Sequence, residues 1–199
     1  MNAHTASARA PRLAPQASPF AADVLEGLSR QPKQLSPKYF YDAAGSELFE
    51  QITAQPEYYP TRVELGILCA REREIAAIIP QGAALVEFGA GSTTKARLLL
   101  RHGRVTAYVP VDISGEFVTA QAANLRRDFP HLRVAPVIAD FTAPFTLPEA
   151  VKAMPKVGFF PGSTLGNFEP QEAAAFLRGA RRILGAGAGL LLGVDLEKD

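Results

Sequence analysis

Cysteine is almost absent from this chain of 199 residues, which contains only Cys69. A single cysteine excludes an intramolecular disulfide and any metal site built from several cysteines. Histidine is scarce as well, and His4, His102 and His131 lack the spacing of metal ligands, so we expect no metal site. Cys69 lies in an apolar helical pattern, which predicts a core position rather than a reactive thiol.

An excess of charge and a long apolar run are also missing. Lys and Arg number 21 and Asp and Glu number 20, so no strong positive field favours nucleic acid or an anionic membrane. No apolar run approaches the roughly eighteen residues of a membrane span, and no apolar segment follows the N-terminal basic residues as in a secretion signal. These absences favour a cytoplasmic protein that acts on a small molecule. Hydrophobic residues make up 47% of the chain, which is enough for a buried core.

The sequence pattern divides the chain into three parts. Residues 1–18 are rich in Ala, Pro, Ser and Arg without apolar periodicity, which predicts a disordered tail. Residues 19–80 carry helical apolar patterns interrupted by aromatic loops around Tyr41 and Tyr58. These aromatic side chains either line a pocket or hold the helices against the core, and both interpretations remain open. Residues 81–199 alternate apolar runs with helical patterns, which predicts an α/β domain.

The stretch ALVEFGAGSTTK at 84–95 joins a short apolar run to a glycine turn and the start of a helix. Gly89 and Gly91 let the backbone turn sharply and let a ligand approach without meeting a Cβ atom. The N–H groups at the start of the following helix favour a carboxylate or a phosphate. We therefore predict that this turn binds a cofactor; the structural alternative is an ordinary glycine-rich turn of an α/β protein.

The residues around the turn distinguish three classes of ligand. A nucleoside-triphosphate loop requires Gly before its lysine and Ser or Thr after it, whereas Lys95 follows Thr94 and precedes Ala96. A dinucleotide fingerprint requires a third glycine where this chain has Thr94, which weakens that interpretation. Glu87 followed by Gly-Ala-Gly is instead similar to the first motif of Rossmann-like S-adenosylmethionine-dependent methyltransferases.

Acidic residues are predicted at the carboxyl ends of the next two strands. Asp112 ends a strand predicted over 105–111, at the distance from the glycine turn where a carboxylate accepts hydrogen bonds from ribose. Pro110 is placed at the end of this strand, because proline lacks the N–H that a central strand donates. A strand predicted over 133–139 ends at Asp140 and Phe141, which suit a purine amine and ring. Alternatively, Asp140 only begins a turn.

Two more strands, predicted over 156–161 and 189–195, complete the sheet. Strands that alternate with helices predict a doubly wound, mostly parallel α/β sheet of the Rossmann-like class in the order 3-2-1-4-5, with an N-terminal helical extension. The unbroken apolar character of the last strand fits burial on both faces. Such sheets bind ligands at their carboxyl edge, where Glu87, Asp112, Asp140 and Asn167 are expected.

Three separate stretches are similar to the histidine Nα-methyltransferases of ergothioneine biosynthesis. The first comprises SPKYFYD at 36–42, GSELF at 45–49 and PEYYPTR at 56–62. The second is VEFGAGSTTK at 86–95, and the third combines FPGSTLGN at 160–167 with LLGVDLEKD at 191–199. The glycine turn is shared with many methyltransferases, whereas the first and third stretches are specific to this family.

The resemblance implies that methyl groups pass three times from S-adenosyl-L-methionine to the α-amino nitrogen of L-histidine, giving hercynine. It assigns the methionyl carboxylate to Lys95, the ribose hydroxyls to Asp112 and the adenine amine to Asp140. The cofactor site is completed by Tyr41, Gly89, Gly91 and Phe141. The amino-acid end of histidine is assigned to Tyr58, Gly162 and Asn167, with Phe49 packing nearby. Asn167 and Tyr58 are the expected catalytic residues; no conventional base is required, because the protein mainly aligns an unprotonated amine.

Members of the family continue past residue 199 into two further strands and a substrate domain that recognises the imidazole ring. On this comparison we expect a sheet truncated after its fifth strand and a missing C-terminal substrate domain. Three alternatives remain open: a cofactor-binding module without activity, a methyltransferase for another amino acid such as a tryptophan derivative, and a nicotinamide-dependent oxidoreductase, which the missing third glycine disfavours. The apolar strand at 189–194 would lie at an unprotected sheet edge, so we expect self-association.

Overall fold

The computed structural model describes residues 18–40 and 42–196, which form two compact units that divide between Tyr39 and Phe40. The first unit contains α1 (Pro19–Ser29) and most of a 3-10 turn, η1 (Pro37–Phe40). Within it, the Tyr39 hydroxyl donates a hydrogen bond to the Asp23 carboxylate at 2.6 Å, and the Tyr39 ring contacts that of Phe20 edge-on. The tail predicted over 1–18 falls almost entirely outside the described residues, and the predicted boundary at 80/81 stays a prediction.

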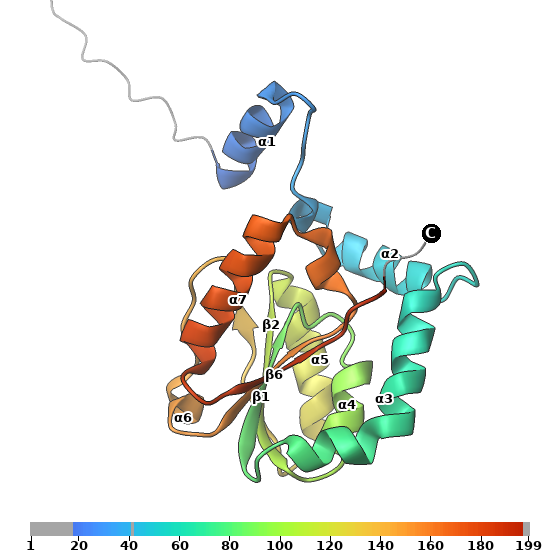
Figure 1. Ribbon diagram of the computed structural model, residues 1–199, viewed down its shortest axis with the longest axis vertical. Helices are drawn as coiled ribbons and strands as arrows, with labels where there is room; N and C mark the ends of the chain where they lie inside the picture. The colour runs from blue at the N-terminus through green and yellow to red at the C-terminus, as the bar shows by residue number, and fades with distance from the viewer. Residues whose placement is uncertain (1–17, 41, 197–199) are drawn as a thin grey trace, which may run out of the picture. The chain divides into compact units, whose positions relative to one another are not determined.

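The second unit is organised around a parallel sheet (Figure 1). Its strands are β1 (Ala83–Phe88), β2 (Val105–Asp112), β3 (Arg133–Val134), β4 (Val137–Ile138), β5 (Lys156–Phe160) and β6 (Gly189–Leu192). They are ordered β3-β2-β1-β5-β6, and β4 also pairs with β2. The predicted α/β fold class and the predicted strand order are confirmed.

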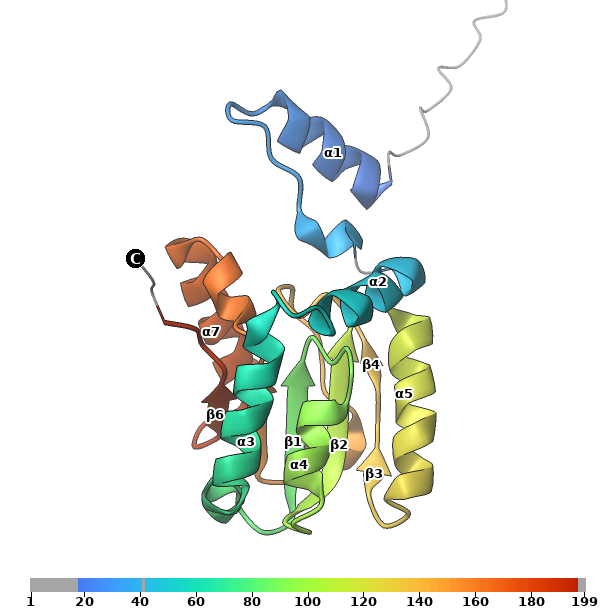
Figure 2. The same ribbon diagram turned by 90° about the vertical axis from the view of Figure 1, so that its right-hand side faces the viewer.

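Helices cover both faces of this sheet. The helices of this unit are α2 (Ala43–Thr53), α3 (Tyr59–Ile78), α4 (Thr94–Leu100), α5 (Gly115–Asp128), α6 (Glu149–Lys152) and α7 (Pro170–Leu184). Figures 1 and 2 show α3, α4 and α5 against one face and α7 against the other. Alternate side chains of β1 point to opposite faces of the sheet. Leu85 packs on the face covered by α3, α4 and α5, and Phe88 packs on the other face with Phe176 of α7. Because both faces are covered, all six residues of β1 are buried.

Pro110 lies inside β2 rather than at its end, so the predicted position was wrong. On the β1 side it pairs in register with Glu87. On the other side, the carbonyls of Tyr108 and Asp112 accept hydrogen bonds from Ala135 (2.9 Å) and Ala139 (3.0 Å). Alternate residues of a strand direct their polar groups to the same side, so an N–H at position 110 would face this neighbour. Pro110 has no N–H to donate, and the strand predicted over 133–139 is interrupted opposite this position, which divides it into β3 and β4.

Helix α3 has twenty residues and is only partly covered by the sheet. Leu68 and Ala76 are buried, whereas Val63 and Ile67 are exposed. Cys69, one position beyond Leu68, is also exposed, so its predicted place in the core was wrong. One residue turns the side chain by about 100° around a helix, which moves it from the covered side to the solvent side. Among the described residues, no helix is both long and apolar enough to cross a membrane.

Candidate functional site

The glycine turn follows β1 at the carboxyl edge of the sheet. Gly89 has a φ of +71°, and the N–H groups of Gly89 and Ala90 both donate to the carbonyl of Val111, at 2.9 and 3.1 Å. The positive φ favours glycine here, and a Cβ atom at this position would also lie tightly, at 3.2 Å, against the ring of Phe141. A Cβ atom at Gly91 would meet nothing within 4 Å, so this part of the turn faces open space.

Asp112 and Asp140 follow neighbouring strands at the same edge. Asp112 pairs in register with Ile138, two residues before Asp140. The carboxylate of Asp112 accepts a hydrogen bond from the N–H of Ser114 at 2.8 Å. Burial raises the pKa of Asp112, and backbone hydrogen bonds partly oppose this effect. The topology therefore brings the two predicted cofactor carboxylates together.

Asp140 also begins a turn, as the structural alternative proposed. Its carboxylate accepts hydrogen bonds from the N–H of Thr142 at 2.9 Å and from the Thr142 hydroxyl at 2.5 Å. The turn interpretation is therefore confirmed, and the predicted contact of Asp140 with the cofactor stays a prediction.

Phe141 is held between the glycine turn and the core. Its ring centroid lies 5.5 Å from that of Phe160 and 5.9 Å from that of Phe176, both in edge-on geometry. The side chain is half-buried. An aromatic ring fixed in this way can offer its exposed part to a flat ligand with little loss of side-chain entropy.

Lys95 and Gly162 meet at the carboxylate of Glu64, a residue that the sequence analysis did not identify. The Lys95 ammonium lies 2.5 Å from Oε2 of Glu64, and the N–H of Gly162 donates to both carboxylate oxygens at 2.9 Å. A clue was present in the sequence. Glu64 precedes the buried Leu68 by one helical turn, and an acid on the inward side of an amphipathic helix needs a partner.

The residues predicted to bind the substrate come from three segments. Tyr58 precedes the first turn of α3, and its ring centroid lies 6.0 Å from that of Phe49 of α2 in edge-on geometry. Asn167 is exposed at the end of the 3-10 turn η2 (Thr164–Asn167). Helix α7 has Glu169 as its N-cap residue, whose N–H donates to the Glu172 carboxylate at 3.0 Å, so Asn167 does not cap this helix. Tyr41, predicted to bind the cofactor, lies outside the described residues.

Glu87 is buried beneath the edge rather than presented at it, with 2% of its surface exposed. Its carboxyl group accepts a hydrogen bond from the Tyr108 hydroxyl. Burial raises the pKa of Glu87 to about 8, although this hydrogen bond and the positive charge of Lys95 act in the opposite direction. Glu87 therefore lies near the carboxyl end of β1, as predicted, but as an interior group whose side chain is not exposed there.

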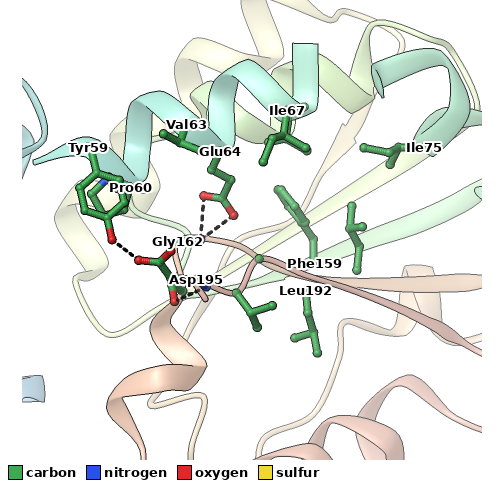
Figure 3. Close-up of a pocket in the computed structure, with 15 residues that line it drawn as sticks. Tyr59, Pro60, Val63, Glu64, Ile67, Ile75, Phe159, Gly162, Leu192 and Asp195 are labelled. Atoms are coloured by element: carbon green, nitrogen blue, oxygen red, sulfur yellow. Dashed lines mark hydrogen bonds between the residues drawn. The ribbon is translucent and has the colours of Figure 1, made fainter. Parts of the chain in front are cut away.

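A cavity of about 220 Å³ lies between α3 on one side and strands β5 and β6 with the segment that follows β6 on the other (Figure 3). Its wall is mainly apolar and includes Ile67, Phe159 and Leu192. At its polar end, the Tyr59 hydroxyl hydrogen-bonds to the Asp195 carboxylate, as Figure 3 shows. Of the predicted site residues that the structure describes, Gly162 alone lines this cavity. The cavity is therefore not the predicted cofactor site.

Comparison with known proteins shows the family to which the chain belongs. A family model described as histidine-specific, S-adenosylmethionine-dependent methyltransferase matches residues 20–199. The chain belongs to this family. A histidine Nα-methyltransferase from Mycobacterium tuberculosis is 42% identical over 181 residues, which cover 89% of this chain and 56% of that protein.

Two further comparisons concern the acceptor and the fold. A 4-dimethylallyltryptophan N-methyltransferase from Epichloe festucae var. lolii is 34% identical over 162 residues, covering 77% of this chain and 47% of that protein. The crystal structure of a magnesium protoporphyrin IX methyltransferase from Synechocystis PCC 6803 has a TM-score of 0.51 at 12% identity, covering 75% of this chain and 73% of that chain. This structural similarity supports the fold alone. The chain spans about half the length of the curated relatives that it matches.

Proposed function

We propose that this chain forms the cofactor-binding part of an S-adenosylmethionine-dependent N-methyltransferase, whose complete form methylates the α-amino nitrogen of L-histidine. The observation that carries the proposal is the family match over residues 20–199. Because the chain spans only 56% of the length of the mycobacterial relative, we propose its activity and substrate and do not transfer them from that relative.

The residues at the sheet edge suit an adenosyl cofactor with an amino-acid end. The open space at Gly91 admits a ligand against the backbone, and Asp112 supplies a carboxylate for vicinal hydroxyls. Phe141 supplies a fixed aromatic ring, and Asp140 follows the neighbouring strand. A lysine ammonium has three donors, so Lys95 can hold a ligand carboxylate in addition to Glu64.

The substrate would lie on the side of Tyr58, Phe49, Gly162 and Asn167. When bound, S-adenosylmethionine supplies an electrophilic methyl group on a sulfonium. The task of the protein is then to bind an unprotonated amine in line with that methyl group and to exclude competing water. We assign Asn167 and Tyr58 to this alignment, because both carry groups that hydrogen-bond to an amine or a carboxylate.

Titration calorimetry and product analysis test the proposal in separate steps. We expect this chain to bind S-adenosylmethionine or S-adenosylhomocysteine. Binding of NADH with no binding of either adenosyl compound would replace the methyltransferase assignment with that of an oxidoreductase. Mass spectrometry of products from a panel of amino acids would then identify the acceptor, and cofactor binding without any product would identify a binding module.

A second candidate is methylation of a tryptophan derivative, favoured by the 34% identity to the Epichloe enzyme. The amino-acid panel should therefore include tryptophan and a prenylated tryptophan. For either acceptor we expect a cytoplasmic protein that acts on a small molecule. We expect no nucleic-acid or membrane partner, because a net charge of +1 provides no strong attraction to nucleic acid or to an anionic membrane.

A further inference from the structure

Glu64 joins three segments that the proposed function assigns to different tasks. It lies in the second turn of α3, the helix that follows the loop carrying Tyr58. Its carboxylate contacts Lys95 of α4, assigned to the cofactor, and the N–H of Gly162 after β5, assigned to the substrate. Figure 3 shows the Glu64 side chain pointing from α3 toward Gly162.

The structure provides a fitted place for this carboxylate. The side chains of Lys95 and Glu64 are only 15% and 18% exposed. A Cβ atom at Gly193 would lie 1.8 Å from Oε1 of Glu64, so the chain beyond β6 leaves space for Glu64 by having glycine there. A carboxylate with these contacts would be costly to displace, since removal would leave both Lys95 and the N–H of Gly162 without this partner.

We propose that Glu64 is a positioning residue that fixes the Lys95 ammonium toward the amino-acid end of the cofactor and holds the Gly162 loop beside it. The proposal rests on the proposed function. It also limits the role of Gly162, whose single N–H donor is already used by Glu64. Gly162 then contributes to substrate binding through its carbonyl and through the absence of a side chain at a φ of +85°.

Two ligands separate this role from general stabilisation. S-adenosylhomocysteine carries the amino-acid end that Lys95 would bind, whereas 5′-methylthioadenosine has the same adenosine without that end. We expect Glu64→Gln to weaken binding of S-adenosylhomocysteine about tenfold or more, because the amide no longer orients the ammonium. Binding of methylthioadenosine should change by less than about twofold, because this ligand lacks the end that Lys95 would bind and a substitution remote from a ligand affects its binding little.

Three further variants complete the calorimetric test. Glu74→Gln, which removes an exposed carboxylate on the same helix that pairs with Arg71 at 2.8 Å, should alter neither affinity. Gly193→Ala should mimic Glu64→Gln, because the new Cβ displaces the end of the Glu64 side chain. In a Lys95→Gln background, adding Glu64→Gln should change the S-adenosylhomocysteine affinity by less than about twofold. The double variant carries no unpaired buried charge at this site, so its comparison with Lys95→Gln remains available if Glu64→Gln alone does not fold.

Four outcomes would overturn the proposal. Unchanged or tighter binding of S-adenosylhomocysteine by Glu64→Gln would make Glu64 irrelevant or a displaceable occupant of the ligand site. Equal losses for both ligands would assign it a general structural role. If Glu64→Gln weakens S-adenosylhomocysteine binding as much in the Lys95→Gln background as in the wild type, Glu64 does not act through Lys95. If the unmodified chain binds neither compound, the proposed function fails and the role of Glu64 fails with it.

Discussion

The Tyr108 hydroxyl donates a hydrogen bond to the Glu87 carboxyl group in the interior of the sheet, and both side chains are almost fully buried. They come from neighbouring strands, β2 and β1. Burial is the largest influence on both groups and raises the pKa of each. With a pKa of about 8, Glu87 is largely protonated at neutral pH, so its interaction with Tyr108 joins two neutral groups.

The Glu87 pair makes stability depend on pH. The folded pKa of about 8 exceeds the ordinary value of 4.5, so the folded state holds this proton more tightly. The stability that the folded protein gains from the protonated Glu87 is fully present below about pH 4.5 and is lost as the pH rises toward and through 8. Relative to wild type, Glu87→Gln should therefore gain stability over this interval, by on the order of a few kcal/mol. Denaturant unfolding at a series of pH values measures this difference.

A matched control for this experiment is Glu74→Gln, which removes an exposed carboxylate. Its stability difference from wild type should be small and nearly constant with pH. Tyr108→Phe should raise the pKa of Glu87 further, because the hydrogen bond from Tyr108 lowers it. Parallel pH profiles for wild type and Glu87→Gln would contradict the assignment of a raised pKa.

Asp112→Ala should weaken binding of S-adenosylhomocysteine by about 1.5 to 3 kcal/mol, roughly ten- to a hundredfold. The reason is the loss of charge-assisted hydrogen bonds from the ribose hydroxyls. Calorimetry of the folded variant measures the change. Asp128→Ala serves as control, because Asp128 pairs with Arg97 at 2.7 Å on the surface and should not affect the ligand. An unchanged affinity for Asp112→Ala would remove Asp112 from the cofactor site.

Much of this fold follows from local patterns, whereas the decisive contacts of the site do not. Strand β1 was predictable because a strand buried on both faces is a continuous apolar run. The contact between Glu64 and Gly162 joins residues 98 positions apart, and only the packing of α3 on the sheet creates it. Glu87 shows a finer limit, since its place near the end of β1 was predictable, whereas its burial against Tyr108 depends on the packing of the neighbouring strand β2.

Variants at Asn167 and Glu169 distinguish a role in substrate binding from a role in stabilising helix α7. In a form extended to the full length of the relatives, Asn167→Ala should raise the KM for histidine or lower kcat while leaving cofactor affinity nearly unchanged. Glu169→Ala should lower stability by about 0.5 to 1.5 kcal/mol, the net contribution of one hydrogen bond, without altering histidine kinetics, because the Glu169 side chain accepts the N–H of Glu172 in the capping box of α7. Steady-state kinetics and thermal unfolding of both variants provide the measurements. Equal losses of cofactor and histidine binding by Asn167→Ala would place Asn167 at the cofactor.

Strand β6 should cause this chain to self-associate. Among the described strands it pairs only with β5, and the segment from Gly189 to Val194 has neither a charged residue nor a proline. The N–H of Gly193 donates to Phe160 of β5 at 3.0 Å, so alternation directs the polar groups of Leu192 to the outer side. Val194, beyond the strand, is 62% exposed and extends the apolar surface. Unprotected apolar edges of this kind pair with further copies of the same chain.

Size-exclusion chromatography with light scattering, over a wide range of protein concentration, tests this expectation. The apparent mass of the unmodified chain should rise with concentration, because edge pairing is a bimolecular equilibrium. Val194→Lys should shift that rise to higher concentration, since a charge beside an edge strand opposes pairing. Ile78→Lys is the matched control, because Ile78 is 75% exposed at the far end of α3. A single monomeric species at every concentration, for the unmodified chain as for Val194→Lys, would show that β6 is not an association edge.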